Sequence, residues 1–218
     1  MKKIVYGIFA EDDANKLFIE SVIPQLVNYF GYVDRVSFVH ELDFTDIVVA
    51  KNGQYVKSNF IITIEIGMTR FGLDLCVIGL DADDNDHEEY FQEMMTELKE
   101  YNLEDKALIF IPVQAIEYWL WYVKIKKENP NLVTTDSIEG SRSRTDLKKL
   151  IYGRKNPRTK LSNPIVQSLS QNIDLNWLRQ CSNSFDHFCK HFEKFVEMID
   201  SESQLPLLRS KLHISSKN

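Results

Sequence analysis

Acidic residues gather directly after one apolar run in the middle of the chain. Residues 75–80 are hydrophobic or glycine, and Asp81, Asp83, Asp84 and Asp86 follow them. Carboxylates spaced so closely repel one another unless cations or water screen their charge. Oxygen ligands of this kind bind Mg²⁺ or Mn²⁺, and such an ion can activate water and stabilise the leaving oxygen of a phosphodiester. This segment is therefore the first candidate for chemistry.

A further carboxylate follows the first apolar segment of the chain. Residues 3–10 are strand-like, and Glu11 comes directly after them, ahead of a helix whose first turn holds Asp12 and Asp13. In open parallel sheets, ligands bind beyond the carboxyl ends of the strands. We therefore expect Glu11 to lie beside Asp81 and to act as an acid–base group or as a further metal ligand.

A solvated acidic loop is the less specific explanation of the same acids. We favour the metal site because Glu11 and the pair formed by Asp81 and Asp83 each follow the end of an expected strand. Asp84 and Asp86 better fit the start of the next helix, where carboxylates meet the positive end of the helix dipole. The expected metal ligands are thus the acids nearest to the strand ends.

One more carboxylate lies in a helical segment rich in aromatic residues. Within residues 114–128, Glu117 either faces the acidic site as a further ligand or pairs with an arginine or lysine. Trp119, Trp121 and Tyr122 of the same segment could stack on nucleic-acid bases. Aromatic packing in the core is the better interpretation, because these side chains bury large apolar areas.

The order of the apolar segments predicts an α/β fold that positions these acids. Strand-like runs alternate with helical ones, which is typical of a doubly wound, mostly parallel sheet flanked by helices. The expected strands are residues 3–10, 33–40, 75–80 and 107–112, and the expected helices are residues 12–30, 88–101, 114–128 and 185–199. Residues 46–67 are expected to form a β-hairpin insertion, because Asn52-Gly53 is a favoured pair for a two-residue turn.

The chain divides into two parts by composition. We assign residues 1–127 to the α/β domain and residues 128–218 to a mainly helical carboxyl-terminal extension packed on it. No apolar run approaches the roughly 20 residues of a membrane span, so we expect no membrane partner. The three cysteines do not form a disulfide framework, which favours a cytoplasmic protein. The sequence leaves a homo-oligomer open.

A basic segment contrasts with the acidic centre. The net charge of the chain is −6, which argues against nonspecific coating of nucleic acid by the whole surface. Residues 141–160 nevertheless hold eight lysines and arginines and one opposing acid. Arg142, Arg144, Lys148 and Lys155 are therefore candidates for contacts to nucleic-acid phosphates. A solvated, flexible loop is the alternative for this segment.

Two histidines four residues apart share a helical face near the carboxyl end. A zinc site at His187 and His191 would need further ligands, and Cys189 between them falls on the apolar stripe of the helix. We therefore expect ordinary exposed histidines here.

The order of the acidic motifs resembles that of the Toprim domain, found in topoisomerases, primases, recombination proteins and OLD-type nucleases. That family carries a Glu after its first strand, matched by Glu11, and an Asp-x-Asp pair after a later strand, matched by Asp81 and Asp83. The segments FIPVQAIEYWLW, which contains Glu117, and SNSFDHFCKHFEKF look like parts of the small stand-alone Toprim-like proteins of bacterial defence loci, including the RloB-like group.

The resemblance implies a Toprim-like parallel sheet and a nuclease that depends on Mg²⁺ or Mn²⁺ and acts on DNA or RNA. Glu11, Asp81 and Asp83 would be its catalytic residues and metal ligands, and Glu117 a further ligand. It also implies an anti-phage defence effector with a partner ATPase. The chain departs from the family at Asp12, where many members have Gly. It also has Asn85 where some have a third Asp, which bears on a second metal ion.

Two other functions compete with the nuclease. In a phospho-receiver, Glu11, Asp12 and Asp13 would bind Mg²⁺ and Asp81 would accept phosphate, but the Lys-Pro pair of that family is missing after the late strand. In a non-catalytic module of an ATPase complex, the same fold would serve only for binding.

Overall fold

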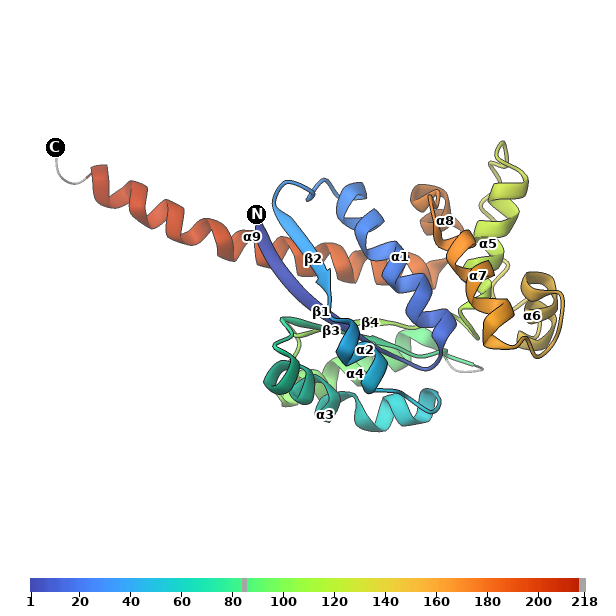
Figure 1. Ribbon diagram of the computed structural model, residues 1–218. Coiled ribbons are helices and arrows are strands. Elements are labelled where there is room, and N and C mark those ends of the chain that lie inside the picture. The colour runs from blue at the N-terminus through green and yellow to red at the C-terminus, as the bar shows by residue number, and fades with distance from the viewer. Residues whose placement is uncertain (84–85, 216–218) are drawn as a thin grey trace.

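Four strands of the described chain form one parallel sheet (Figure 1). The computed structural model describes residues 1–83 and 86–215, with side chains as far as Ser201. The sheet order is β2-β1-β3-β4. The strands are β1 (Lys2–Ala10), β2 (Val36–His40), β3 (Leu75–Gly79) and β4 (Ala107–Phe110). The expected parallel sheet is confirmed, and so is the burial of its inner strand β3, which is buried along its whole length.

Helices cover both faces of the sheet (Figure 1). One face carries α2 (Leu42–Ile47), α3 (Gly53–Phe71) and α4 (His87–Glu100). The layer over the other face contains α1 (Asp13–Tyr29), α5 (Glu117–Glu128), α7 (Thr159–Ser170), α8 (Leu175–Cys181) and α9 (Asn183–Ser215). The remaining helix, α6 (Arg144–Tyr152), packs beside α5.

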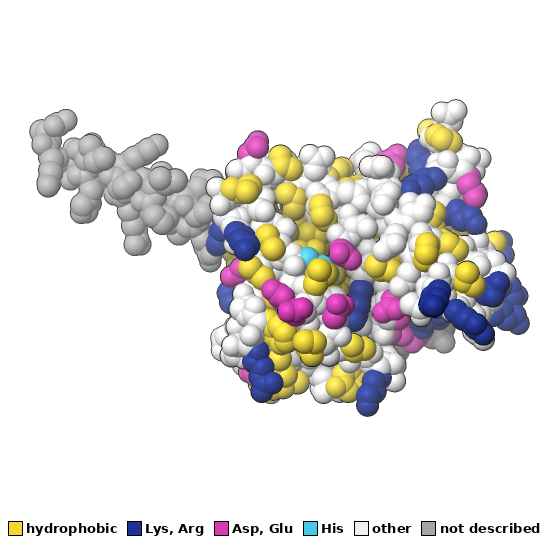
Figure 2. Space-filling model, in the orientation of Figure 1, with side chains coloured by type: hydrophobic (Ala, Val, Ile, Leu, Met, Phe, Trp, Pro, Cys, Tyr) yellow, Lys and Arg dark blue, Asp and Glu magenta, His cyan; other side chains and the backbone are white. Residues whose placement is uncertain are grey.

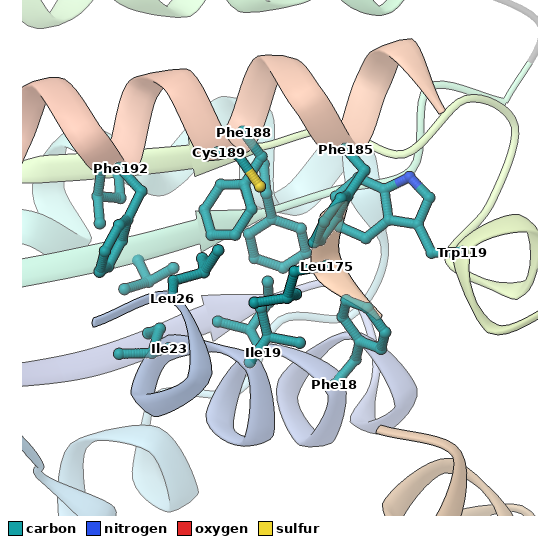
Figure 3. Packing of buried hydrophobic residues seen from close by; sticks show 14 of the residues in the cluster. Phe18, Ile19, Ile23, Leu26, Trp119, Leu175, Phe185, Phe188, Cys189 and Phe192 are labelled. Atoms are coloured by element: carbon teal, nitrogen blue, oxygen red, sulfur yellow. The ribbon is translucent and has the colours of Figure 1, made fainter. Parts of the chain in front are cut away.

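Side chains alternate along the strands between two hydrophobic clusters, as the period of a strand requires. In β1, Ile8 faces the cluster that includes α1 and α9, whereas Phe9 faces the cluster of α3 and α4. Figure 3 shows the first cluster, where Phe18 of α1 and Phe188 of α9 pack with Trp119 of α5. Because this cluster draws on both of the expected parts of the chain, the carboxyl-terminal helices complete the cover of this sheet face.

The expected β-hairpin at residues 46–67 is wrong, because most of this stretch is helix α3. Asn52 has an extended backbone and its side chain accepts a hydrogen bond from the Tyr55 N–H at 2.8 Å, so it caps the helix instead of forming a two-residue turn. The buried residues Val56, Phe60, Thr63, Ile64 and Gly67 follow helical spacing. Packing of this one face against the sheet outweighs the strand preference of the β-branched residues.

The order of the strands creates a switch point between β1 and β3. The chain leaves β1 through α1 on one face towards β2, and leaves β3 through α4 on the other face towards β4. Connections that diverge in this way open a crevice at the carboxyl ends of the two strands, where open α/β sheets bind their ligands. Glu11 and Asp81 follow these two strand ends.

The sequence-based expectations about cysteines and membranes can be compared with the fold. Cys76, Cys181 and Cys189 are buried and free, so the expectation that they form no disulfides is confirmed. Across the part of the chain that the structure describes, no helix has the length and hydrophobicity needed to span a bilayer.

Candidate functional site

Glu11 and Asp81 meet at the switch point, as the sequence predicts. Glu11 Oε2 accepts a hydrogen bond from the backbone N–H of Asp81 at 3.1 Å. The backbone N–H of Glu11 in turn donates to the Gly79 carbonyl at 3.0 Å. These two bonds continue the pairing of β1 and β3 beyond the strands and hold the two acidic loops side by side.

Asp81 is the most deeply buried of these acids, with 2% of its surface exposed. Its Oδ1 accepts hydrogen bonds from the Ile116 backbone N–H at 3.1 Å and from Asn15 Nδ2 at 3.3 Å. Its Oδ2 accepts no hydrogen bond, although Arg144 Nη2 lies 2.8 Å away in an ion pair. Burial raises the pKa of Asp81 well above its usual value, and the positive charge of Arg144 only partly opposes that rise.

Asn15 is a site residue that sequence reasoning missed. It lies in the first turn of α1 and is fully buried, and its Nδ2 donates to both Asp12 and Asp81. A polar residue on the face of α1 that also carries Phe18 and Val22 was the available signal, because buried polar side chains require hydrogen-bond partners. Asn15 thereby links the amino end of α1 to the end of β3.

Asp83 and Asp12 stand at the more open side of the site. Asp83 has a backbone φ of 52°, in the left-handed region, and its side chain is 61% exposed. Asp12 caps α1 by accepting a hydrogen bond from the Asn15 N–H at 3.0 Å. The expected role of Asp12 at the start of the helix is therefore confirmed. Asp86 likewise caps α4, whereas Asp84 lies outside the described residues.

Arg144 lies among the carboxylates and not on the outer surface. Its Nη2 is 2.8 Å from Asp81 Oδ2, 3.5 Å from Glu11 Oε1 and 3.8 Å from Asp12 Oδ2. Its Nη1 is 3.2 Å from Asp83 Oδ1. Burial alone would lower the pKa of Arg144, but the surrounding carboxylates raise it overall, so it stays charged. One guanidinium thus faces four carboxyl groups.

Glu117 begins α5 beside this cluster, with 2% of its side chain exposed. Its Oε1 is 3.8 Å from Lys148 Nζ, and its Oε2 accepts no hydrogen bond. Burial raises the pKa of Glu117, and Lys148 opposes that shift. Of the two alternatives for Glu117, the pairing with a basic residue is therefore present, while the role of metal ligand stays a prediction.

The basic segment does not form one uniform surface. Arg144 and Lys148 belong to α6 and turn towards acids, so a flexible loop is the wrong description for residues 144–152. Arg142 and Lys155 are exposed. The Cζ atom of Arg142 lies over the Trp121 ring, 5.2 Å from the ring centroid. Figure 2 shows lysines and arginines gathered at the end of the molecule where α6 and α7 lie.

Gly53 brings the amino end of α3 against the same site. A Cβ atom built on Gly53 would lie 2.8 Å from Glu11 Oε2. The missing side chain therefore leaves room for the Glu11 carboxylate. The expected hairpin turn placed Asn52-Gly53 at the tip of an insertion, far from the acids. It therefore did not predict the contact between Gly53 and Glu11.

The donor set suits a hard divalent cation, although the present arrangement holds an arginine. Carboxylate oxygens are the ligands that Mg²⁺ and Mn²⁺ prefer, and Asp81 Oδ2 is a buried oxygen that accepts no hydrogen bond. Among the described residues, no three His, Cys, Asp or Glu side chains converge as a metal site, and the Arg144 guanidinium lies between the acids. The positive charge among these acids is supplied by Arg144.

The expectation that His187 and His191 are exposed is wrong. Both are partly buried between α9 and α4, where the His187 ring packs at a tilt against Phe91 with 4.2 Å between ring centroids. His191 Nδ1 accepts a hydrogen bond from the Ile109 N–H of the edge strand β4 at 3.4 Å. The sequence shows a polar helix face, but not that this face covers a strand edge.

The expected core role of two aromatic residues in α5 is confirmed. Trp119 is fully buried and Tyr122 is 2% exposed. Trp119 Nε1 donates to Ser184 Oγ at 2.9 Å, and the Tyr122 hydroxyl donates to the Cys181 carbonyl at 3.0 Å. Both polar ends are satisfied inside the protein, so these two rings are structural.

Searches of protein-family models, curated proteins and solved structures found no match to this chain. The fold is an α/β fold with a four-stranded parallel sheet in its described part.

Proposed function

We propose that this chain is a Toprim-like nuclease that requires Mg²⁺ or Mn²⁺ to hydrolyse phosphodiester bonds in DNA or RNA. The observation that carries the proposal is the junction of Glu11 and Asp81 at the switch point, with one buried Asp81 oxygen accepting no hydrogen bond. Four carboxyl groups face a single guanidinium there. This excess of negative charge favours a divalent cation over a monovalent one.

Each acid has a role that follows from its position. Glu11, Asp81 and Asp83 would hold the ion, with Glu117 as a further ligand, and the bound ion supplies charge stabilisation at the phosphodiester oxygens. The Ile116 N–H and Asn15 fix Asp81 Oδ1, so that Oδ2 points into the site. Burial raises the pKa of Glu11, which brings this carboxyl group closer to the range where it can exchange a proton at neutral pH.

The nucleic acid would approach along the exposed part of the basic segment. Arg142 and Lys155 are exposed near α6, and contacts from such cations to phosphates position a substrate without reading its sequence. In this proposal Arg144 and Lys148 lie at the border between the acids and the substrate. The resemblance extends the proposal to a cytoplasmic anti-phage effector, with a partner ATPase and self-association as further hypotheses.

A nuclease assay with a paired control tests the proposal. Purified chain is incubated with single- and double-stranded DNA and RNA in Mg²⁺ or Mn²⁺. Asp81→Ala/Asp83→Ala should reduce the cleavage rate by about 100-fold or more, because metal stabilisation of charge supplies several kcal/mol to the barrier.

Glu104→Ala/Asp105→Ala is the matched control for this assay. It removes the same charge from the turn before β4, away from the site, and should retain the activity. Absence of cleavage under every condition, or equal loss in both double variants, would contradict the nuclease.

A non-catalytic binding module is the second candidate. The presence of the Arg144 guanidinium among the acids favours it, because a cationic side chain can neutralise the site with no metal at all. In that case no divalent cation binds, and the purified chain stays inactive until a partner contributes the missing groups. The phospho-receiver is disfavoured, because its acceptor Asp81 is 2% exposed and a phosphodonor would not reach it.

A further inference from the structure

We propose that Arg144 is a built-in competitor of the metal, which closes the acidic site with its guanidinium until a divalent cation displaces it. The inference rests on the proposed function and adds a form of regulation to it. In this proposal α6, which contributes no acid to the site, controls the access of cations to the acids through Arg144.

The contacts of Arg144 are those expected of a substitute for a cation. Its two terminal nitrogens lie within 4 Å of one oxygen each of four carboxyl groups. The shortest of these contacts, 2.8 Å, is to Asp81 Oδ2, the buried oxygen that accepts no hydrogen bond. The guanidinium and a metal ion ligated by Asp81 and Asp83 would therefore occupy the same space.

Charge balance explains why such a competitor is useful. A buried carboxylate without a partner is costly, so an empty site of this composition would destabilise the fold. Arg144 supplies the missing positive charge, with the carboxylates holding it in the charged form. The fold can thus form before any metal is bound.

The hold on Arg144 is incomplete, which allows its displacement. The Nε of Arg144 is buried and has no hydrogen-bond partner, and the side chain is 30% exposed. Arg144 is the first residue of α6, directly after the Ser143 cap, so rotation of its side chain requires no movement of the helix. Leu147 and Ile151, on the buried face of α6, remain packed when the guanidinium swings out.

Metal binding measured by calorimetry tests the competition without relying on activity. Mn²⁺ is titrated into the natural chain, into Arg144→Gln and into Arg154→Gln. Arg154 is exposed after α6 and serves as the matched control for the loss of one positive charge. Arg144→Gln should bind Mn²⁺ at least tenfold more tightly than the natural chain, and Arg154→Gln should bind it as the natural chain does.

The outcomes separate this inference from the proposed function. Equal Mn²⁺ affinity in the natural chain and in Arg144→Gln would overturn the competition and leave the metal site standing. Absence of Mn²⁺ binding in all three proteins would overturn both. An equal gain in Arg154→Gln would reduce the effect to general charge and would also overturn the competition.

A thermal measurement covers the case in which Arg144→Gln folds poorly without metal. The competition predicts that Mn²⁺ raises the melting temperature of Arg144→Gln by more than that of the natural chain. Arg144→Lys keeps the charge but loses the planar fork that reaches several carboxylates, so it should show an intermediate Mn²⁺ affinity. An Arg144→Gln protein that Mn²⁺ does not stabilise, or an Arg144→Lys affinity no tighter than that of the natural chain, would contradict the proposal.

Discussion

Asp81 combines a fixed oxygen with one that accepts no hydrogen bond, and this asymmetry defines the site at the scale of single residues. Oδ1 is held by the Ile116 N–H and by Asn15, whereas Oδ2 has only the ion pair with Arg144. Glu11 is held in the same way, by one hydrogen bond to the backbone of Asp81. Backbone N–H groups, together with Asn15 at Asp81, therefore orient the two carboxylates, which leaves their remaining oxygens available for a cation.

Gly53→Ala tests whether the position of Glu11 matters for that cation. The added Cβ would come within 2.8 Å of Glu11 Oε2 and displace it from the Asp81 N–H. The obstacle is the flexible end of a side chain, so the free energy of unfolding should change by less than about 1 kcal/mol. Mn²⁺ affinity, in contrast, should fall about tenfold, as calorimetry on the folded variant would show.

Gln54→Ala is the control for Gly53→Ala, since Gln54 is the exposed next residue in the first turn of α3. It should leave both stability and Mn²⁺ affinity unchanged. Unaltered Mn²⁺ affinity in Gly53→Ala would mean that Glu11 is not a ligand, or that it finds a second position from which it still binds.

At the scale of elements, α3 shows how packing decides between two local preferences. Its residues include a β-branched run that suits a strand, yet its buried positions follow a helical period. The helix lets one face cover the sheet while its amino end reaches Glu11. The element that looked like an insertion is thus part of the frame of the site.

Substitution of the α3 cap distinguishes the helix from a hairpin. Asn52→Ala removes the side-chain acceptor for the Tyr55 N–H and should lower the free energy of unfolding by about 1 kcal/mol in urea denaturation. Asn52→Ser preserves an acceptor and should cost much less. A type I′ turn, which needs a positive φ at this residue, would make the two variants similarly unfavourable.

The sequence was sufficient for the strands, for the helices α1, α4, α5 and α9, and for the pair formed by Glu11 and Asp81, since these depend on local periodicity and on the rule for strand ends. It was not sufficient for Arg144 or Asn15. Which of eight cations in residues 141–160 would reach the acids depends on how α6 packs against α5, a contact that no local pattern encodes. Long-range packing is also the reason why the expected β-hairpin at residues 46–67 and the expected exposure of His187 and His191 are wrong.

At the scale of the whole molecule, the first half of α9 packs against the sheet that carries the site. Phe188 fills the core beneath the sheet, while His191 contacts the outer edge of β4, which is buried along its length. An uncovered strand edge invites pairing with other chains, and a helix laid along it prevents that. The carboxyl-terminal part of the chain therefore covers one face and the β4 edge of the sheet.

His191 makes this contact dependent on pH. Its Nδ1 accepts a hydrogen bond from Ile109, which requires the neutral ring, and burial is the main cause that lowers its pKa to about 4. In the unfolded chain a histidine has a pKa of about 6.5. Between these pH values the unfolded state binds a proton that the folded state does not. The contribution of the neutral His191 to the free energy of unfolding is therefore fully present above pH 6.5 and is lost as the pH falls towards 4.

His191→Asn should flatten this part of the stability curve. The Asn side chain can still accept a hydrogen bond from the Ile109 N–H, but it does not titrate. Between pH 6.5 and 4, the free energy of unfolding of the variant should therefore fall by up to about 3 kcal/mol less than that of the natural chain. Urea denaturation at several pH values measures the difference between the two proteins. Parallel curves would mean that His191 is protonated in the folded state without cost. Its contact with β4 would then not be what holds α9 along the edge of the sheet.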